Sequence, residues 1–107
     1  MDATTVAVDL AKNVFQLAVA DAEWRIVGRH RLTRGQFERW FHSRAVGLVA
    51  MEACGSAHYW ARWLQAKGIA VKLLPPRYVR QYVKRNKTDA ADAAAILEAT
   101  RCADIVP

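Results

Sequence analysis

The chain has few cysteines, few acidic residues and no long apolar run. Its 107 residues include two cysteines, Cys54 and Cys102, which excludes a secreted scaffold held together by several disulfides. No segment approaches the roughly 18 consecutive apolar residues that a membrane helix requires, which excludes a transmembrane protein. The segment from Met1 to Thr4 has neither the basic nor the apolar region of a secretion signal. We therefore expect a cytoplasmic protein without a membrane partner.

Acidic residues are outnumbered by basic ones. The chain has 16 Lys and Arg against 10 Asp and Glu, which gives a net charge of +6. Eleven of the basic residues are Arg, whose planar guanidinium matches the oxygens of a phosphate. A small basic domain favours a polyanionic partner, most often nucleic acid. The same composition is also compatible with a soluble basic domain that binds no nucleic acid.

Changes in hydrophobic period predict the order of strands and helices. Two-residue alternation and short apolar runs indicate strands, whereas apolar residues three and four apart indicate helices. Strands are predicted over 6–11, 14–20, 24–32, 46–51 and 69–74, and helices over 33–44, 56–68, from 77 onward, and over 88–101. Three antiparallel strands followed by alternating helices and strands predict one α/β domain, a mixed five-stranded sheet flanked by helices.

Local signals support several of these boundaries. Thr33 and Gln36 fit a capping box at the start of the first helix. Ser56 is a candidate cap for the second helix, and Gly68 is placed to close it. The pair Pro75-Pro76 ends the fifth strand and can begin the third helix.

Two carboxylates stand at apolar strands. Asp9 lies within the run from Val6 to Leu10, and Glu52 follows the run from Val46 to Met51. A carboxylate in a buried strand is unfavourable unless it is paired or binds a cation. The alternative is that each faces water at a strand end.

Asp89 and Asp92 are three residues apart at the start of the last predicted helix, so they share one face of it. Acids in a first turn also interact favourably with the helix dipole, which is the simpler explanation. If these two converge with Asp9 and Glu52, the four negative charges require cations. Oxygen ligands suit Mg²⁺ or Mn²⁺, and two such ions about 4 Å apart can catalyse phosphoryl transfer. By analogy, this placement of acids is that of the RNase H-like fold.

Three segments around these acids resemble a known family. They are Ala7 to Lys12, Met51 to Ser56, and Asn86 to Ala93. Together they are similar to the N-terminal domain of the DEDD-type bacterial insertion-sequence transposases. The resemblance implies a RuvC-like domain in which Asp9, Glu52, Asp89 and Asp92 are catalytic metal ligands.

The resemblance also implies an activity and partners. The reaction is DNA transposition by metal-dependent strand cleavage and transfer, guided by a structured RNA that pairs with donor and target DNA. Family members carry a second, downstream domain with a nucleophilic serine. The segment from Asp104 to Pro107 has no pattern that marks a domain end, so we expect this chain to be the front part of a longer protein. We also expect a homo-oligomer.

Basic residues gather between Pro76 and Asp89, with no acid among them. We expect this segment and one lysine beyond the first strand to contact DNA or guide RNA through phosphates. The residues are Arg77, Arg80, Lys84, Arg85, Lys87 and Lys12. Tyr78 and Tyr82 lie beside them and could stack on bases. The alternative is a solvated amphipathic helix. A second basic stripe lies along the third strand and its exit and consists of Arg25, Arg29, Arg31 and Arg34.

Other functions remain open at this level. One is a stand-alone resolvase-like nuclease that cuts branched or hybrid substrates with Mg²⁺. Another is a nucleic-acid-binding module whose metal site is inactive. A third is an oligomerisation module with Trp60 and Trp63 at its interface, although tryptophans at helical spacing are more often core residues.

Overall fold

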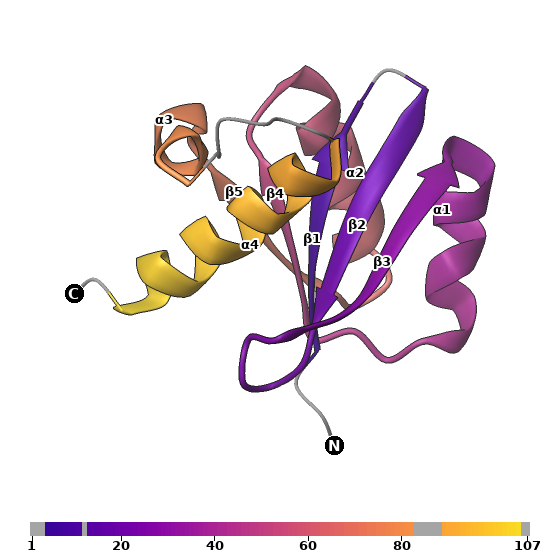
Figure 1. The fold of residues 1–107 in the computed structure, drawn as a ribbon. Coiled ribbons are helices and arrows are strands. Elements are labelled where there is room, and N and C mark those ends of the chain that lie inside the picture. The colour runs from indigo at the N-terminus through magenta and orange to yellow at the C-terminus, as the bar shows by residue number, and fades with distance from the viewer. Residues whose placement is uncertain (1–3, 12, 83–88, 106–107) are drawn as a thin grey trace.

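The computed structural model describes residues 4–11, 13–82 and 89–105 and consists of one sheet with helices on both faces (Figure 1). The strands and helices are β1 (Thr5–Leu10), β2 (Val14–Ala20), β3 (Ile26–Thr33), α1 (Arg34–Trp40), the 3-10 helix η1 (Phe41–Ser43), β4 (Leu48–Glu52), α2 (Gly55–Gln65), β5 (Ala70–Leu74), α3 (Pro76–Arg80) and α4 (Asp89–Ile105). The five strands lie in the order β3-β2-β1-β4-β5. The β1–β2 and β2–β3 pairs are antiparallel, and the β1–β4 and β4–β5 pairs are parallel. The predicted mixed five-stranded sheet is confirmed.

Several predicted boundaries need correction, and the fourth strand, for example, begins at Leu48 rather than at residue 46. The third strand begins at Ile26 rather than Trp24, because residues 21–25 form the turn of the β2–β3 hairpin. The second helix begins at Gly55 after Cys54, and no side chain caps it, so Ser56 is not its cap. The third helix ends at Arg80, whereas the basic spacing predicted a longer one.

The β2–β3 turn is held by one carboxylate. The Asp21 side chain accepts hydrogen bonds from the backbone N–H groups of Glu23, at 2.9 Å, and Arg25, at 3.0 Å. Trp24 takes a left-handed backbone conformation there, with φ of 65°, which an ordinary residue adopts only when its surroundings require it. These two hydrogen bonds hold the turn that contains Trp24, so Asp21 stabilises the hairpin.

The face of the sheet toward α1 and α2 carries an aromatic core. Phe37 of α1 packs edge-to-face against Phe15 of β2 and Trp60 of α2, with ring centroids 4.8 and 5.1 Å away. Trp60 is 1% exposed, so it is a core residue. Thr33 and Gln36 form the predicted capping box, which fixes where α1 leaves β3.

The opposite face is lined by small side chains and covered by α4. Neighbouring strands place Ala18, Ala7 and Ala50 at one level across β2, β1 and β4. These alanines are fully buried and pack with Ala93 and Ile96 of α4. Because alanine projects little beyond the backbone, α4 lies close to the sheet. In the described part of the chain, no helix has the length and apolar character needed to cross a membrane.

Candidate active site at the carboxyl ends of β1 and β4

Asp9 and Glu52 stand at the same end of two adjacent parallel strands. The register pairs Val8 of β1 with Met51 of β4, so the next residue along each strand is one of the acids. Ala7 and Ala50 belong to the cluster under α4. Because side chains alternate between faces, Asp9 and Glu52 project from that same face. Both are half-buried.

The other two predicted ligands begin α4. Asp89 and Asp92 lie in the first turn of the helix, directly before Ala93, which is fully buried in the alanine cluster. Figure 1 draws the start of α4 at the end of the sheet toward which the β1 arrow points. The backbone therefore brings the start of α4 to the face that carries Asp9 and Glu52. The side chains of Asp89 and Asp92 lie outside the described residues.

The donor chemistry of this end of the sheet suits a hard cation. Asp9 and Glu52 offer carboxylate oxygens, and neighbouring strands are about 4.8 Å apart, so two negative charges lie close together in a partly buried setting. Among the side chains that the structure describes, no three His, Cys, Asp or Glu residues form a metal-binding group. The sequence predicts that Asp89 and Asp92 of α4 supply further oxygen ligands, and this stays a prediction.

The predicted basic segment begins beside these acids. Leu74 of β5 pairs with Glu52 of β4, and α3 starts two residues later. Arg77 and Arg80 of α3 are both exposed. The Arg77 guanidinium lies 5.5 Å from the ring centroid of Tyr78, which is 43% exposed and available for stacking.

The rest of the predicted basic set is not placed. Lys84, Arg85, Lys87 and Lys12 lie outside the described residues. The prediction that one continuous helix carries the basic residues from Arg77 onward is wrong, because α3 ends at Arg80 and Gln81 and Tyr82 form a turn.

Tyr82 connects that turn to α4. Its phenol has a pKa raised above the usual value mainly by a hydrogen bond with the Cys102 thiol. Within α4, Arg101 forms an ion pair with Glu98, and this lowers the pKa of the Glu98 carboxyl. Tyr82 also packs against the alanine cluster, so it links the turn after α3 to α4.

Two polar residues lie beside Asp9 in the strand register, one on each of the next two strands toward the β3 edge of the sheet. Asp9 pairs with Gln16 of β2, and Gln16 pairs with Arg31 of β3. We call Arg31, Gln16, Asp9 and Glu52 the polar row. Sequence reasoning missed Gln16, although a glutamine between Phe15 and Leu17 in an apolar strand was a visible signal.

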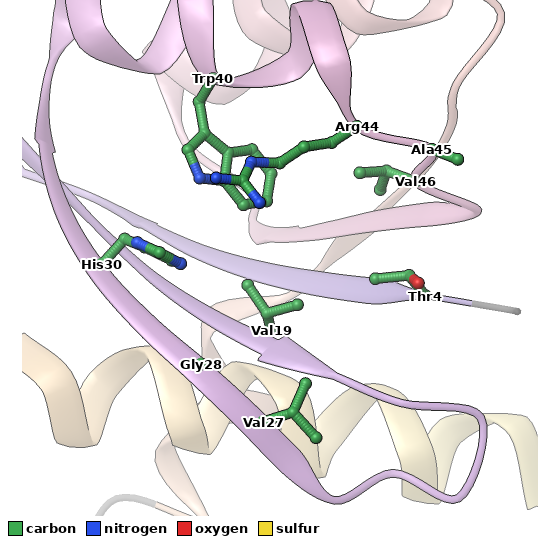
Figure 2. Close-up of a pocket in the computed structure, with 9 residues that line it drawn as sticks. All are labelled: Thr4, Val19, Val27, Gly28, His30, Trp40, Arg44, Ala45 and Val46. Carbon is green, nitrogen blue, oxygen red and sulfur yellow. The ribbon is translucent and has the colours of Figure 1, made fainter.

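A pocket of about 360 Å³ lies elsewhere, on the aromatic face of the sheet (Figure 2). There the Arg44 guanidinium stacks 4.6 Å from the centroid of Trp40, and the His30 ring centroid is 5.5 Å from that of Trp40. The buried Nε1 of Trp40 has no hydrogen-bond partner among the described residues. Thr4, which precedes β1, also lines this pocket, so the pocket lies far from the carboxyl end of β1 that carries Asp9.

Comparison with solved structures defines the class of fold. The chain superposes on T. thermophilus RuvC, solved in complex with a Holliday junction substrate, with a TM-score of 0.63. The match covers 96% of this chain and 96% of that chain at 14% sequence identity. The domain therefore has the RuvC-like variant of the RNase H-like fold, as predicted.

Comparison of sequences then gives the family. The family model of the IS110-type DEDD transposases, described as a transposase, matches residues 6–106. The chain belongs to this family. It is 48% identical over 99 residues to a probable family 20 transposase of Pseudomonas aeruginosa. It is 43% identical over 98 residues to the transposase of insertion sequence element IS1111A from Coxiella burnetii.

These alignments cover most of this chain but a small part of each relative. Each covers 92% of this chain, but 29% of the P. aeruginosa protein and 27% of the C. burnetii protein. The chain thus spans little more than a quarter of the length of these relatives.

Proposed function

We propose that this chain is the metal-dependent DNA-cleavage domain of a transposase, with Asp9, Glu52, Asp89 and Asp92 as its catalytic metal ligands. The observation that carries the proposal is the placement of Asp9 and Glu52 at one level of β1 and β4, on the face where α4 begins with the other two acids. Membership of a DEDD transposase family supports the choice of reaction.

The four carboxylates would hold Mg²⁺ or Mn²⁺, whose oxygen-ligand preference they match. When bound, such ions supply Lewis-acid stabilisation of the charge that develops on phosphoryl oxygens. The chain's own contribution is to fix the carboxylates, two on strands of the central sheet and two on a helix packed against it. The sheet side is rigid because Val8 and Met51, next to the acids, are fully buried in the aromatic core.

DNA is the proposed substrate, and we propose that Arg77 and Arg80 of α3 contact its phosphates, which is supported by their exposure and by the pairing of Leu74, just before α3, with Glu52. On the sequence alone, the proposal also includes Lys84, Arg85, Lys87 and Lys12. We further propose that a structured RNA guides the reaction, that the protein acts as a homo-oligomer, and that a downstream serine-bearing domain completes it. These three parts of the proposal derive from the family resemblance.

Calorimetric titration with Mn²⁺ tests the metal site directly. The unchanged chain is expected to bind Mn²⁺, and Asp9→Asn is expected to abolish or strongly weaken binding while preserving side-chain size. Glu23→Gln, which neutralises an exposed carboxylate in the β2–β3 turn, is the matched control and is expected to bind normally. Equal heats for the unchanged chain and Asp9→Asn would reject the site. Salt-sensitive DNA binding in that case would indicate a nucleic-acid-binding module instead.

A further inference from the structure

The polar row reaches the outer edge of the sheet through Gln16 and Arg31. Each residue is paired with the next across β1, β2 and β3. Gln16 is two residues before Ala18, which is buried under α4, so strand alternation places Gln16 on the α4 face. Its partner Arg31 projects from the same face. Two strand spacings separate Arg31 from Asp9, which is about 10 Å.

Among the described residues, the β3 edge of this face presents exposed side chains. β3 is an outer strand of the sheet, and Figure 1 draws α4 running from the upper end of β1 away from β3, so α4 does not lie over the carboxyl end of β3. Arg31 is exposed, as is Arg29, which lies two residues earlier on the same face. The residues between and beyond them, His30 and Leu32, turn to the aromatic side, where His30 meets Trp40.

The charges of the polar row change sign along its length. Arg31 is positive, Gln16 is neutral and Asp9 and Glu52 are negative. A phosphodiester chain that approaches the acids would be repelled by them, and a guanidinium in direct contact with a phosphate of the same chain provides an opposing attraction. A neutral amide between the two can donate a hydrogen bond to a phosphate oxygen without competing for the cations.

We propose that Arg31 and Gln16 position the DNA backbone as it approaches Asp9, in an inference that rests on the proposed function. Arg31 grips a phosphate through its planar fork, and Gln16 donates to a phosphate nearer the acids. At a rise of about 3.4 Å per nucleotide, the Arg31 contact falls within about three nucleotides of the bond that is cut. The basic residues of α3 lie on the other side of Glu52, so DNA is held on both flanks of the acids.

The experiment measures binding of a fluorescent DNA duplex by anisotropy at several salt concentrations, in an Asp9→Asn background without metal. Arg31→Ala is expected to weaken binding about five- to tenfold at low salt and to reduce the slope of log affinity against log salt by about 1. Arg31→Lys restores the slope but only part of the affinity, because lysine keeps the charge and loses the fork. Gln16→Ala is expected to weaken binding about two- to threefold without changing the slope, because no charge is removed.

Arg39→Ala is the matched control. It removes the same charge from an exposed position on α1, which lies on the aromatic side of the sheet. It is expected to change affinity less than about twofold. Equal losses from Arg31→Ala and Arg39→Ala would overturn this inference and leave the proposed metal site untouched, because Mn²⁺ calorimetry reads that site separately. Absence of any DNA binding by the unchanged chain at low salt would overturn this inference and the proposed DNA substrate, while Mn²⁺ calorimetry still tests the metal site independently.

Discussion

Asp9 and Glu52 each follow, by one residue, the paired residues Val8 and Met51 on adjacent parallel strands. The pairing fixes the level of both acids, and strand alternation fixes their face. The acids are therefore close because of backbone hydrogen bonding rather than because they attract each other. Their mutual repulsion lowers the stability of the fold, and the packing of the rest of the sheet offsets this loss.

Neutralising Glu52 should reveal this repulsion. Without metal, Glu52→Gln is expected to raise the free energy of unfolding by up to about 0.5 kcal/mol, since like charges side by side in a sheet are destabilising. With Mg²⁺ at about 100 times its dissociation constant, the unchanged chain should gain about 2.7 kcal/mol and the variant much less. Urea unfolding with and without Mg²⁺ measures both effects, and Glu23→Gln should respond to Mg²⁺ like the unchanged chain. An identical Mg²⁺ gain for Glu52→Gln would contradict its role as a ligand.

Replacing a buried alanine under α4 with a larger residue should push the helix away from the sheet. Ala50→Val adds two methyl groups at a fully buried position and is expected to lower the free energy of unfolding by about 1–3 kcal/mol. Ala70→Val, at an exposed position on β5, is the control and should stay within about 0.5 kcal/mol of the unchanged chain. The measurement is urea unfolding monitored by circular dichroism. Equal stability of the two variants would mean that α4 does not pack tightly on the alanines.

The two helix starts should respond differently to the loss of a hydroxyl. Thr33→Ala removes a cap that accepts a hydrogen bond from the backbone N–H of Gln36, so it is expected to cost about 1 kcal/mol. Ser56→Ala is expected to change stability by less than about 0.5 kcal/mol, because no side chain caps α2. Thermal unfolding of the two variants is the measurement. A larger loss for Ser56→Ala than for Thr33→Ala would reverse this assignment.

The β2–β3 turn should weaken in acid. The pKa of Asp21 is lowered from 3.8 chiefly by the hydrogen bond from the backbone N–H of Arg25, with a smaller contribution from that of Glu23. Because the folded pKa is depressed, the stabilisation is present above about pH 4 and is lost as the pH falls through the folded value. The difference in melting temperature between the unchanged chain and Asp21→Ala should therefore be largest near neutral pH and shrink below pH 4. A difference that stayed constant down to pH 2 would contradict the role of the ionised carboxylate.

Short-range signals in the sequence predicted much of this fold. The capping box of Thr33 and Gln36 is a local hydrogen-bond pattern, so its residues alone indicate it, and the structure contains it. The five strands follow from two-residue alternation or from short apolar runs within each segment. The helix after Pro75 was expected to continue along the basic residues because their spacing suits a helix. It ends at Arg80 because Tyr82 turns back to pack against the α4 cluster, a tertiary contact that local spacing does not contain.

The candidate site was only partly accessible from sequence. Asp9 and Glu52 were visible as acids at apolar strands, and the structure places them at one level. The polar row was not visible, because the alignment of Gln16 with Arg31 depends on strand register rather than on sequence distance. Whether the side chains of Asp89 and Asp92 join the other two acids stays a prediction.

The two faces of the sheet differ in how firmly their helices are held. Aromatic rings anchor α1 and α2, whereas the sheet residues under the middle of α4 are largely alanines, and each methyl group provides little apolar area to bury. On energetic grounds α4 should be the first of these helices to detach in local opening. Such an event would carry Asp89 and Asp92 away while Asp9 and Glu52 stayed fixed in the sheet. The proposed site has two acids on the sheet and two on α4. Movement of α4 alone would therefore form or break the site without unfolding of the domain.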